Sequence, residues 1–181
     1  MLKQFIDDVK EVYGLEKYYI TNVKCSKCKD VRYHSKLATK DLLKIVTTYS
    51  CRSEKIRVPN VIENGNHEIK SEFLRCFWSD DGGLGIYQRN MRFELIGTQK
   101  NSNFLKEIAE LHRDFNIGFK IQEKQHRIRI SNKNEIIKFF KRIGFLTGSL
   151  VTKGNFVGRE KNDLLNEMLN IKGWLNYGPV V

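Results

Sequence analysis

The segment that most constrains this chain covers residues 73–86 and reads FLRCFWSDDGGLGI. Its first half carries apolar residues at helical spacing, and two adjacent carboxylates, Asp80 and Asp81, follow directly. Two glycines come next, and then a strand pattern begins. Acidic side chains at a helix C-terminus face the negative end of the helix dipole, which costs about 0.3 kcal/mol or more each. A chain that places two of them there often has a cation or a reaction for them to serve. On local chemistry alone, a helix that ends in an Asp-Gly turn is the favoured interpretation.

The residues around this segment predict a regular order of elements. Alternating apolar residues over 84–95 predict a two-stranded hairpin, and residues 105–115 repeat at helical spacing. A second pair of strands is expected over 117–130, and a further helix ends at Gly144. Residues 69–145 therefore predict an α+β fold with the order αββαββα and antiparallel strand pairs.

An internal repeat extends this pattern to the N-terminal part of the chain. Residues 5–15 parallel residues 105–117 in their apolar spacing, and each segment is followed by two polar strands and a helix that starts after a serine, Ser35 or Ser131. The first copy holds only the αββα part. The domain boundaries that we expect are a truncated repeat at 1–47, a linker at 48–66, a complete repeat at 67–150 and a tail with one helix at 151–181.

Residues 74–82, LRCFWSDDG, resemble the nonapeptide that names the LAGLIDADG homing endonuclease family. A common variant of that motif reads Leu-Arg-Gly-Phe-Phe-Asp-x-Asp-Gly, so this chain departs from it at Cys76 and Ser79. The order αββαββα is the repeat unit of that family. The resemblance implies a two-repeat fold with a polar antiparallel β-saddle, in which the first motif, expected upstream of Met1, is missing.

The same resemblance implies a partner, a cofactor and site residues. The family binds specific sites in double-stranded DNA and hydrolyses phosphodiesters with Mg²⁺ (or Mn²⁺), and its members are associated with introns and inteins. Asp81 matches the metal-binding and catalytic acid of the motif. Gln99 matches a position where the family has a glutamine that orients water. Lys153 is the nearest lysine after the point where the family commonly places one.

The resemblance also bears on assembly. Double-strand cleavage in this family uses two active sites, whereas this chain supplies one motif. A homodimer through the helix at 73–81 would restore the second site. Against this arrangement, Cys76 and Trp78 are bulkier than the small residues that let two such helices approach closely.

Composition and strand alternation indicate a nucleic-acid partner. The chain carries 32 Lys and Arg against 21 Asp and Glu, a formal net charge of +11, which suits a polyanion. Alternation along the strands places polar residues on the face opposite the core, where a ribbon can read base edges in the major groove. The DNA-binding residues that we expect are Lys24, Arg32, Tyr87, Arg89, Arg92, Lys120, Gln122, Arg127 and Arg129.

Two other interpretations stay open at this point. The first is a non-cleaving DNA- or RNA-binding protein on the same fold, such as a regulator or an intron maturase, or a degenerate member of the family. The second is a small zinc-binding module built on Cys25 and Cys28, which is weakened because Cys51 and Cys76 do not form a second pair. No segment reaches transmembrane length and the N-terminus carries acids where a signal peptide is apolar, so we expect a soluble, cytoplasmic protein.

Overall fold

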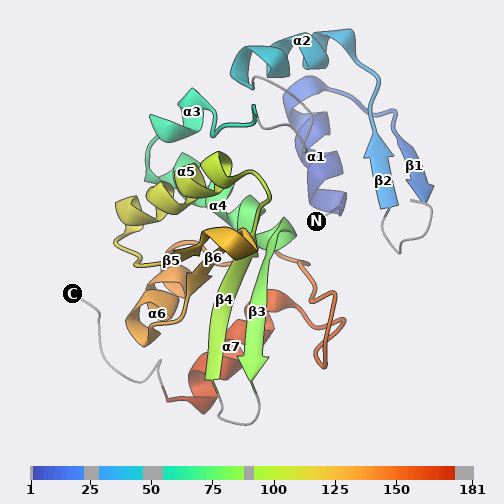
Figure 1. Cartoon of the computed structure of the whole chain (residues 1–181). Helices are drawn as coiled ribbons and strands as arrows, with labels where there is room; N and C mark the ends of the chain where they lie inside the picture. Colours follow the sequence, from blue (N-terminus) through green and yellow to red (C-terminus); the bar gives the residue numbers. More distant parts are fainter. Residues whose placement is uncertain (1, 23–28, 47–54, 88–91, 174–181) are drawn as a thin grey trace. The chain divides into compact units, whose positions relative to one another are not determined.

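The chain forms two compact units, Met1–Ile45 and Val46–Val181. The structure is a computed structural model, shown whole in Figure 1, and it describes residues 2–22, 29–46, 55–87 and 92–173. Its strands pair in antiparallel fashion and helices connect them. The mixed α+β class expected from the sequence is therefore confirmed.

The N-terminal unit is small and has little apolar interior. Its ring contacts include the edge-to-face pairs of Phe5 with Tyr33 and of Tyr19 with His34, and the tilted pair of Tyr18 and Tyr33. The hydroxyl of Tyr13 lies 3.2 Å from a carboxylate oxygen of Asp41. Among its described residues, Ala38 is the buried hydrophobic one. The elements of this unit are α1 (Leu2–Tyr13), β1 (Tyr19–Asn22), β2 (Lys29–Arg32) and α2 (Lys36–Ile45).

The C-terminal unit contains the expected order αββαββα, preceded by a short helix and followed by a longer one. Asn66, Asn101 and Asn132 each cap the helix that follows them, accepting backbone N–H groups through their side-chain oxygens. The elements of this unit are α3 (Asn60–Glu63), α4 (His67–Asp80), β3 (Gly82–Tyr87), β4 (Arg92–Thr98), α5 (Ser102–Leu111), η2 (His112–Phe115), β5 (Lys120–Gln122), η3 (Glu123–Gln125), β6 (Arg127–Ile130), α6 (Lys133–Arg142) and α7 (Lys161–Ile171).

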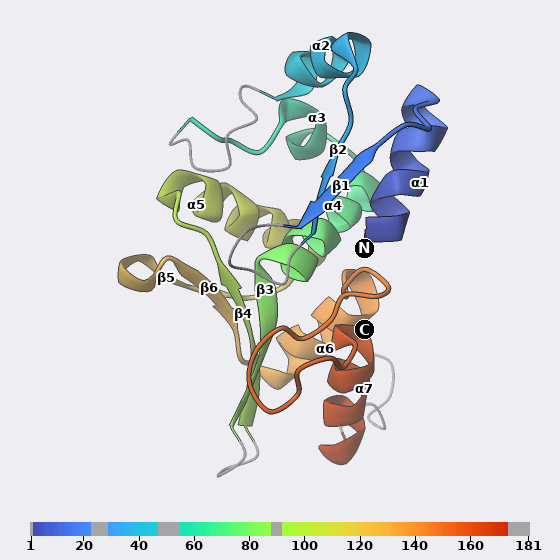
Figure 2. The ribbon, with the colours of Figure 1, turned by 90° about the vertical axis from the view of Figure 1, so that its right-hand side faces the viewer.

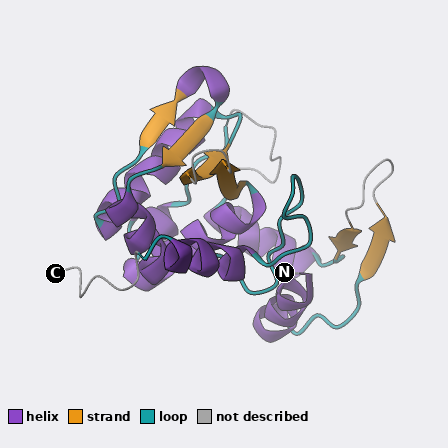
Figure 3. Ribbon diagram, turned by 90° about the horizontal axis from the view of Figure 1, so that it is seen from below, coloured by secondary structure: helices purple, strands orange, loops and turns teal. Residues whose placement is uncertain are grey.

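The C-terminal unit is built on a four-stranded antiparallel sheet with the order β3-β4-β6-β5. Leu95 pairs with Leu84 on one side and with Ile130 on the other, so apolar residues line one face of the sheet. Helices α6 and α7 lie on that side, and the opposite side is open (Figure 2). The view from below shows the same separation of strands from helices (Figure 3). The sheet is therefore apolar toward the helices and free to carry polar residues on the other face.

Helix α4 packs closely on the apolar face because two glycines make room for it. A Cβ at Gly97 would lie 2.8 Å from the ring of Phe77 and 2.9 Å from Ile128. A Cβ at Gly82 would lie 2.5 Å from the ring of Trp78 and 2.7 Å from its carbonyl oxygen. Close approach of helix and strand thus requires glycine at both positions, and it fixes where α4 ends relative to β3 and β4.

Two expectations about segments differ in detail from the structure. The second strand pair begins only at Lys120, so Ile117 and Phe119 lie before β5. The segment expected as a linker contains α3, and Val58 in it joins the core, so the backbone there is part of the C-terminal unit. None of the described helices combines the length and apolar character that a membrane span requires.

Candidate functional site

The carboxylates of Asp80 and Asp81 lie at the C-terminal end of α4, where the chain turns into β3. Asp80 is the last residue of the helix, and Asp81 is its C-cap, with its backbone N–H bonded to the carbonyl of Phe77 at 2.8 Å. Both aspartates are exposed, while Trp78 and Ser79 immediately before them are buried. A rigid helix end therefore presents two acids to solvent.

The structure brings Asp81 and Gln99 together. The side-chain Nε2 of Gln99 donates to Oδ2 of Asp81 at 3.4 Å. Thr98 fixes the backbone of the same turn, since its N–H and its hydroxyl donate to the carbonyl of Asp81 at 3.0 and 3.2 Å. Gln99 is itself held, because its N–H donates to the carbonyl of His126 at 3.0 Å. Residues 81 and 99, predicted as site residues from the sequence, thus form one contact.

A buried lysine that was not predicted from the sequence holds the backbone of this turn through hydrogen bonds. Lys161, the first residue of α7, is 5% exposed, and its Nζ donates to the carbonyls of Ser79 and Gly82 at 2.7 Å each. The carbonyl of Ser79 also accepts from the hydroxyl of Ser149 at 3.1 Å. An ammonium at a helix C-terminus satisfies carbonyls that have no partner inside the helix and opposes the negative end of the dipole.

Ser79, where the nonapeptide often has aspartate, is a structural residue here. Its hydroxyl donates to the carbonyl of Arg75 at 2.6 Å and accepts the backbone N–H of Leu146 at 2.7 Å. It joins the end of α4 to the segment that follows α6. A carboxylate at this buried position would lack the donated proton, so serine suits the site better than aspartate does.

The charges at the turn influence one another. Partial desolvation raises the pKa of Asp80, and the ammonium of Lys161 opposes that shift. Desolvation also raises the pKa of Asp81, repulsion from Asp80 raises it further, and Lys161 again opposes the shift. Burial lowers the pKa of Lys161 while the two carboxylates act to raise it. A further cation near Asp80 and Asp81 would relieve their repulsion.

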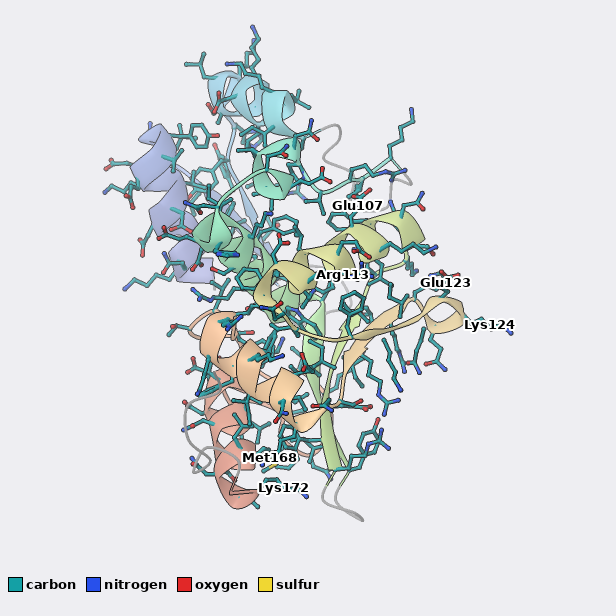
Figure 4. The ribbon with its side chains drawn as sticks, turned by 90° about the vertical axis from the view of Figure 1, so that its left-hand side faces the viewer. Glu107, Arg113, Glu123, Lys124, Met168 and Lys172 are labelled. Atoms are coloured by element: carbon teal, nitrogen blue, oxygen red, sulfur yellow. The ribbon has the colours of Figure 1, made fainter. Side chains whose placement is uncertain are left out.

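The polar face of the sheet adjoins this turn. Thr98, which binds the carbonyl of Asp81, pairs across the strands with Arg127, and Arg127 pairs with Gln122. One step farther along, Arg129 pairs with Lys120. Figure 4 shows Glu123 and Lys124 at the β5–β6 turn, on the opposite side of the sheet from Met168 of α7. Four of the basic or amide residues predicted to contact DNA therefore share one face with the carboxylate turn at its end.

A second cluster on the polar face was also missed by the sequence analysis. The side chain of Glu94 is only 3% exposed although it belongs to this open face. It forms ion pairs with Arg129 and, at 3.7 Å, with Arg92, and it accepts a hydrogen bond from the hydroxyl of Tyr87 at 2.7 Å. Strand alternation alone indicates the direction of Glu94, but it does not reveal that the side chain is buried.

The remaining residues predicted from the sequence belong to other segments of the chain than the turn that carries Asp80 and Asp81. Lys153 is exposed in the segment between α6 and α7, and among the described residues no polar contact joins it to Asp81. The lysine that acts on the two carboxylates is Lys161. Arg32 is exposed and belongs to the N-terminal unit. The predictions for Lys24, Arg89 and the cysteines Cys25, Cys28 and Cys51 concern residues outside the described part of the chain.

The turn has the donor chemistry of a divalent-cation site but few donors. Mg²⁺ prefers oxygen ligands and retains several waters, so one or two exposed carboxylates with phosphate oxygens are a suitable set. Asp80 and Asp81 are such carboxylates. Within the described part of the chain, no group of three or more His, Cys, Asp or Glu is placed to hold an ion. The residues therefore fit a cation that a nucleic-acid phosphate or a second chain helps to bind.

Comparison with protein-family models, with curated proteins and with solved structures finds no match for this chain.

Proposed function

We propose that this protein binds specific sites in double-stranded DNA in the manner of a LAGLIDADG homing endonuclease and hydrolyses phosphodiesters with Mg²⁺ or Mn²⁺ at Asp81. The observation that carries the proposal is the continuity of two surfaces. Thr98 bonds to the carbonyl of Asp81 and pairs with Arg127, so the carboxylate turn forms one end of the basic sheet face. DNA lying along that face would bring a phosphate close to the carboxylates.

Each group at the turn has a role under this proposal. Asp81 would hold the cation, with Asp80 as its neighbour, and Gln99 would orient water beside Asp81. A bound divalent cation would polarise the scissile phosphate and lower the pKa of a water molecule. Arg127, Gln122 and Lys120 would position the DNA backbone or contact base edges. Lys161 would keep the end of α4 fixed through its bonds to the carbonyls of Ser79 and Gly82.

A homodimer through α4 is part of the same proposal, because one chain presents one such turn. Ile69, Glu72 and Cys76 are exposed on α4 together with Asp80. Trp78 is fully buried in its own core, so its bulk does not obstruct this side of the helix, contrary to the expectation from sequence. A second α4 could therefore approach the exposed side, and Cys76 would then lie in the seam at the position where the motif usually has glycine.

A second function is favoured by one observation. The ammonium of Lys161 already acts on Asp80 and Asp81 and opposes the rise in their pKa. A positive group close behind the carboxylates weakens their attraction for a metal ion. The alternative is accordingly a DNA- or RNA-binding protein that uses the same face without hydrolysis, as a regulator or a maturase would.

Asp81→Asn tests the proposed chemistry. We expect this change to abolish Mg²⁺- or Mn²⁺-dependent nicking, to preserve binding to duplex DNA, and to leave the protein at least as stable. The stability should not fall, because desolvation and Asp80 both disfavour the charged form of Asp81. Cleavage is measured on supercoiled plasmid carrying a selected site, binding by fluorescence anisotropy of labelled duplex, and stability by urea unfolding.

Asp80→Asn is the matched control, since it removes the same charge one residue earlier. It should retain more nicking activity than Asp81→Asn. Wild-type protein that binds DNA but shows neither nicking nor Mn²⁺ uptake in its presence would reject the enzyme and leave the binding protein. Absence of salt-dependent binding both to duplex DNA and to RNA would reject both functions.

A further inference from the structure

Glu94 is an acid on a sheet face whose other charged strand residues, Arg92, Lys120, Arg127 and Arg129, are basic. Its Oε1 accepts the hydroxyl of Tyr87, and its Oε2 faces the guanidinium groups of Arg129 and Arg92. Both carboxylate oxygens are therefore occupied, and the side chain is 3% exposed. A buried carboxylate with this many partners holds their directions as well as its own.

Glycine on the neighbouring strand makes the cluster possible. Gly85 pairs with Glu94, and a Cβ there would lie 3.3 Å from Cγ of Glu94 and 3.6 Å from the ring of Tyr87. Without a side chain at position 85, the ring of Tyr87 can reach across and cover Glu94. The hydrogen bond raises the pKa of Tyr87, which agrees with a hydroxyl that stays protonated and donates to Glu94.

The cluster changes how the two arginines can act on DNA. The side chain of Arg129 is 23% exposed and that of Arg92 is 52% exposed, so Arg129 is the more tightly held of the two. An arginine paired with a carboxylate gains less from an arbitrary phosphate, because it must give up that partner. An arginine side chain that is already held in a fixed direction loses less conformational entropy when it binds a correctly placed acceptor.

We propose that Glu94 is a specificity-determining residue of the DNA-binding face: it withholds Arg129 from nonspecific phosphate contacts and fixes Arg129 and Tyr87 in the directions in which they read a target. This inference rests on the proposed DNA-binding function. It predicts that removing a negative charge from the face increases affinity for arbitrary DNA while reducing discrimination between sequences. If the ion pair were purely structural, a folded variant would gain no more affinity than the loss of any other acidic charge gives, and its discrimination would be unchanged.

Glu94→Gln is the test, with Glu123→Gln as the matched control. Both changes add one unit of positive charge, but Glu123 is exposed at the β5–β6 turn, where it pairs with Lys106. The probe is a pool of DNA duplexes of random sequence, bound between about 50 and 200 mM salt. We expect Glu94→Gln to bind this pool about five- to tenfold more tightly at 0.1 M salt, with a log–log salt slope steeper by about 0.9 for each newly contacted phosphate. Glu123→Gln should show a smaller change.

Selection from the same pool measures discrimination. Wild type and Glu123→Gln should enrich the same sequence, whereas Glu94→Gln should enrich it less, with the loss confined to a few adjacent base pairs. Tyr87→Phe provides a second variant that leaves net charge and core unchanged. Tyr87→Phe should lose part of the preference for the selected sequence without a steeper salt slope. If Glu94→Gln does not fold, this variant alone tests the role of the Glu94 cluster in specificity.

The outcomes separate the inference from the function on which it rests. Wild-type protein that fails to bind the pool in a salt-dependent way overturns the DNA-binding function itself. If the wild type binds the pool, and Glu94→Gln, Glu123→Gln and Tyr87→Phe all show its salt slope and select its sequence, the role of Glu94 is overturned. The DNA-binding function itself would then stand.

Discussion

At the scale of single residues, the segment 74–82 divides its side chains between the core and the surface. Leu74, Phe77 and Trp78 enter the core, and the Nε of Arg75 donates to the carbonyl of Ile143 at 2.7 Å. Asp80 and Asp81 alone among the last residues of this segment reach solvent as acids. Helical spacing in the sequence predicted the apolar positions of this segment, and Leu74, Phe77 and Trp78 are buried as expected. It could not predict Lys161, which reaches the turn from 80 residues farther along the chain.

His112 provides a prediction at this scale. It is fully buried, its Nδ1 lies 2.8 Å from the carbonyl of Ile108, and its Nε2 accepts the indole N–H of Trp78 at 2.9 Å. Burial lowers the pKa of His112 to about 4. The unfolded chain takes up a proton below about pH 6.5 and the folded chain does not, so stability should fall as the pH drops from about 6.5 to about 4, by about 3 kcal/mol in total.

Urea unfolding across that pH range measures the effect. His112→Gln is the control, because an amide supplies both a donor and an acceptor but does not titrate. The difference between wild type and this variant isolates the imidazole from the carboxylates that titrate at lower pH. A difference that stays constant with pH would contradict the assignment of the slope to His112.

At the scale of elements, the end of α4 is defined by its neighbours in space. Gly82 and Gly97 let the helix approach β3 and β4, Thr98 binds the carbonyl of Asp81, and Lys161 binds the carbonyls on either side of the aspartates. Periodicity predicted the helices and strands of this unit, since each buries one regular face. The shortened β5 and the buried Glu94 were not predictable, because they depend on how strands pair and not on the pattern within one strand.

Two adjacent glycines offer a sharp test of this packing. Gly82→Ala should lower the free energy of unfolding by about 1–3 kcal/mol, because the new methyl would overlap the ring and backbone of Trp78. Gly83→Ala should stay within about 0.5 kcal/mol of wild type, since nothing lies within 4 Å of its Cβ. Chemical unfolding of the two variants side by side provides the comparison. Equal losses would mean that backbone freedom, and not the contact with Trp78, is what position 82 requires.

At the scale of the whole molecule, the two units differ in what holds them together. The apolar cluster of the C-terminal unit extends from Val58 to Leu169 and draws on both sheet and helices. The described part of the N-terminal unit buries one small hydrophobic residue, Ala38, and leaves Leu37 81% exposed. A chain segment with so little buried apolar surface adds little to stability by itself.

Deletion of residues 1–45 tests this difference. The remaining chain should fold, and its thermal midpoint should lie within about 4 °C of that of the full protein. In the full protein, backbone amides of α1 and α2 should exchange with solvent much faster than those of β4 and β6. Calorimetry and hydrogen exchange measure the two effects. Loss of folding on deletion would show that the C-terminal unit depends on the first 45 residues.

The burial of Trp78 has a practical consequence for all of these experiments. Trp78 precedes Asp81 by three residues in the chain. Its indole is fully buried, lies against Gly82 and donates a hydrogen bond to His112. Its emission should therefore be blue-shifted and should respond to movement of the carboxylate turn. With Trp174 replaced by phenylalanine, Trp78 is the only tryptophan left in the chain. The protein thus carries an intrinsic optical probe at its candidate site, with which the proposed binding of a cation and of DNA can be tested without a label.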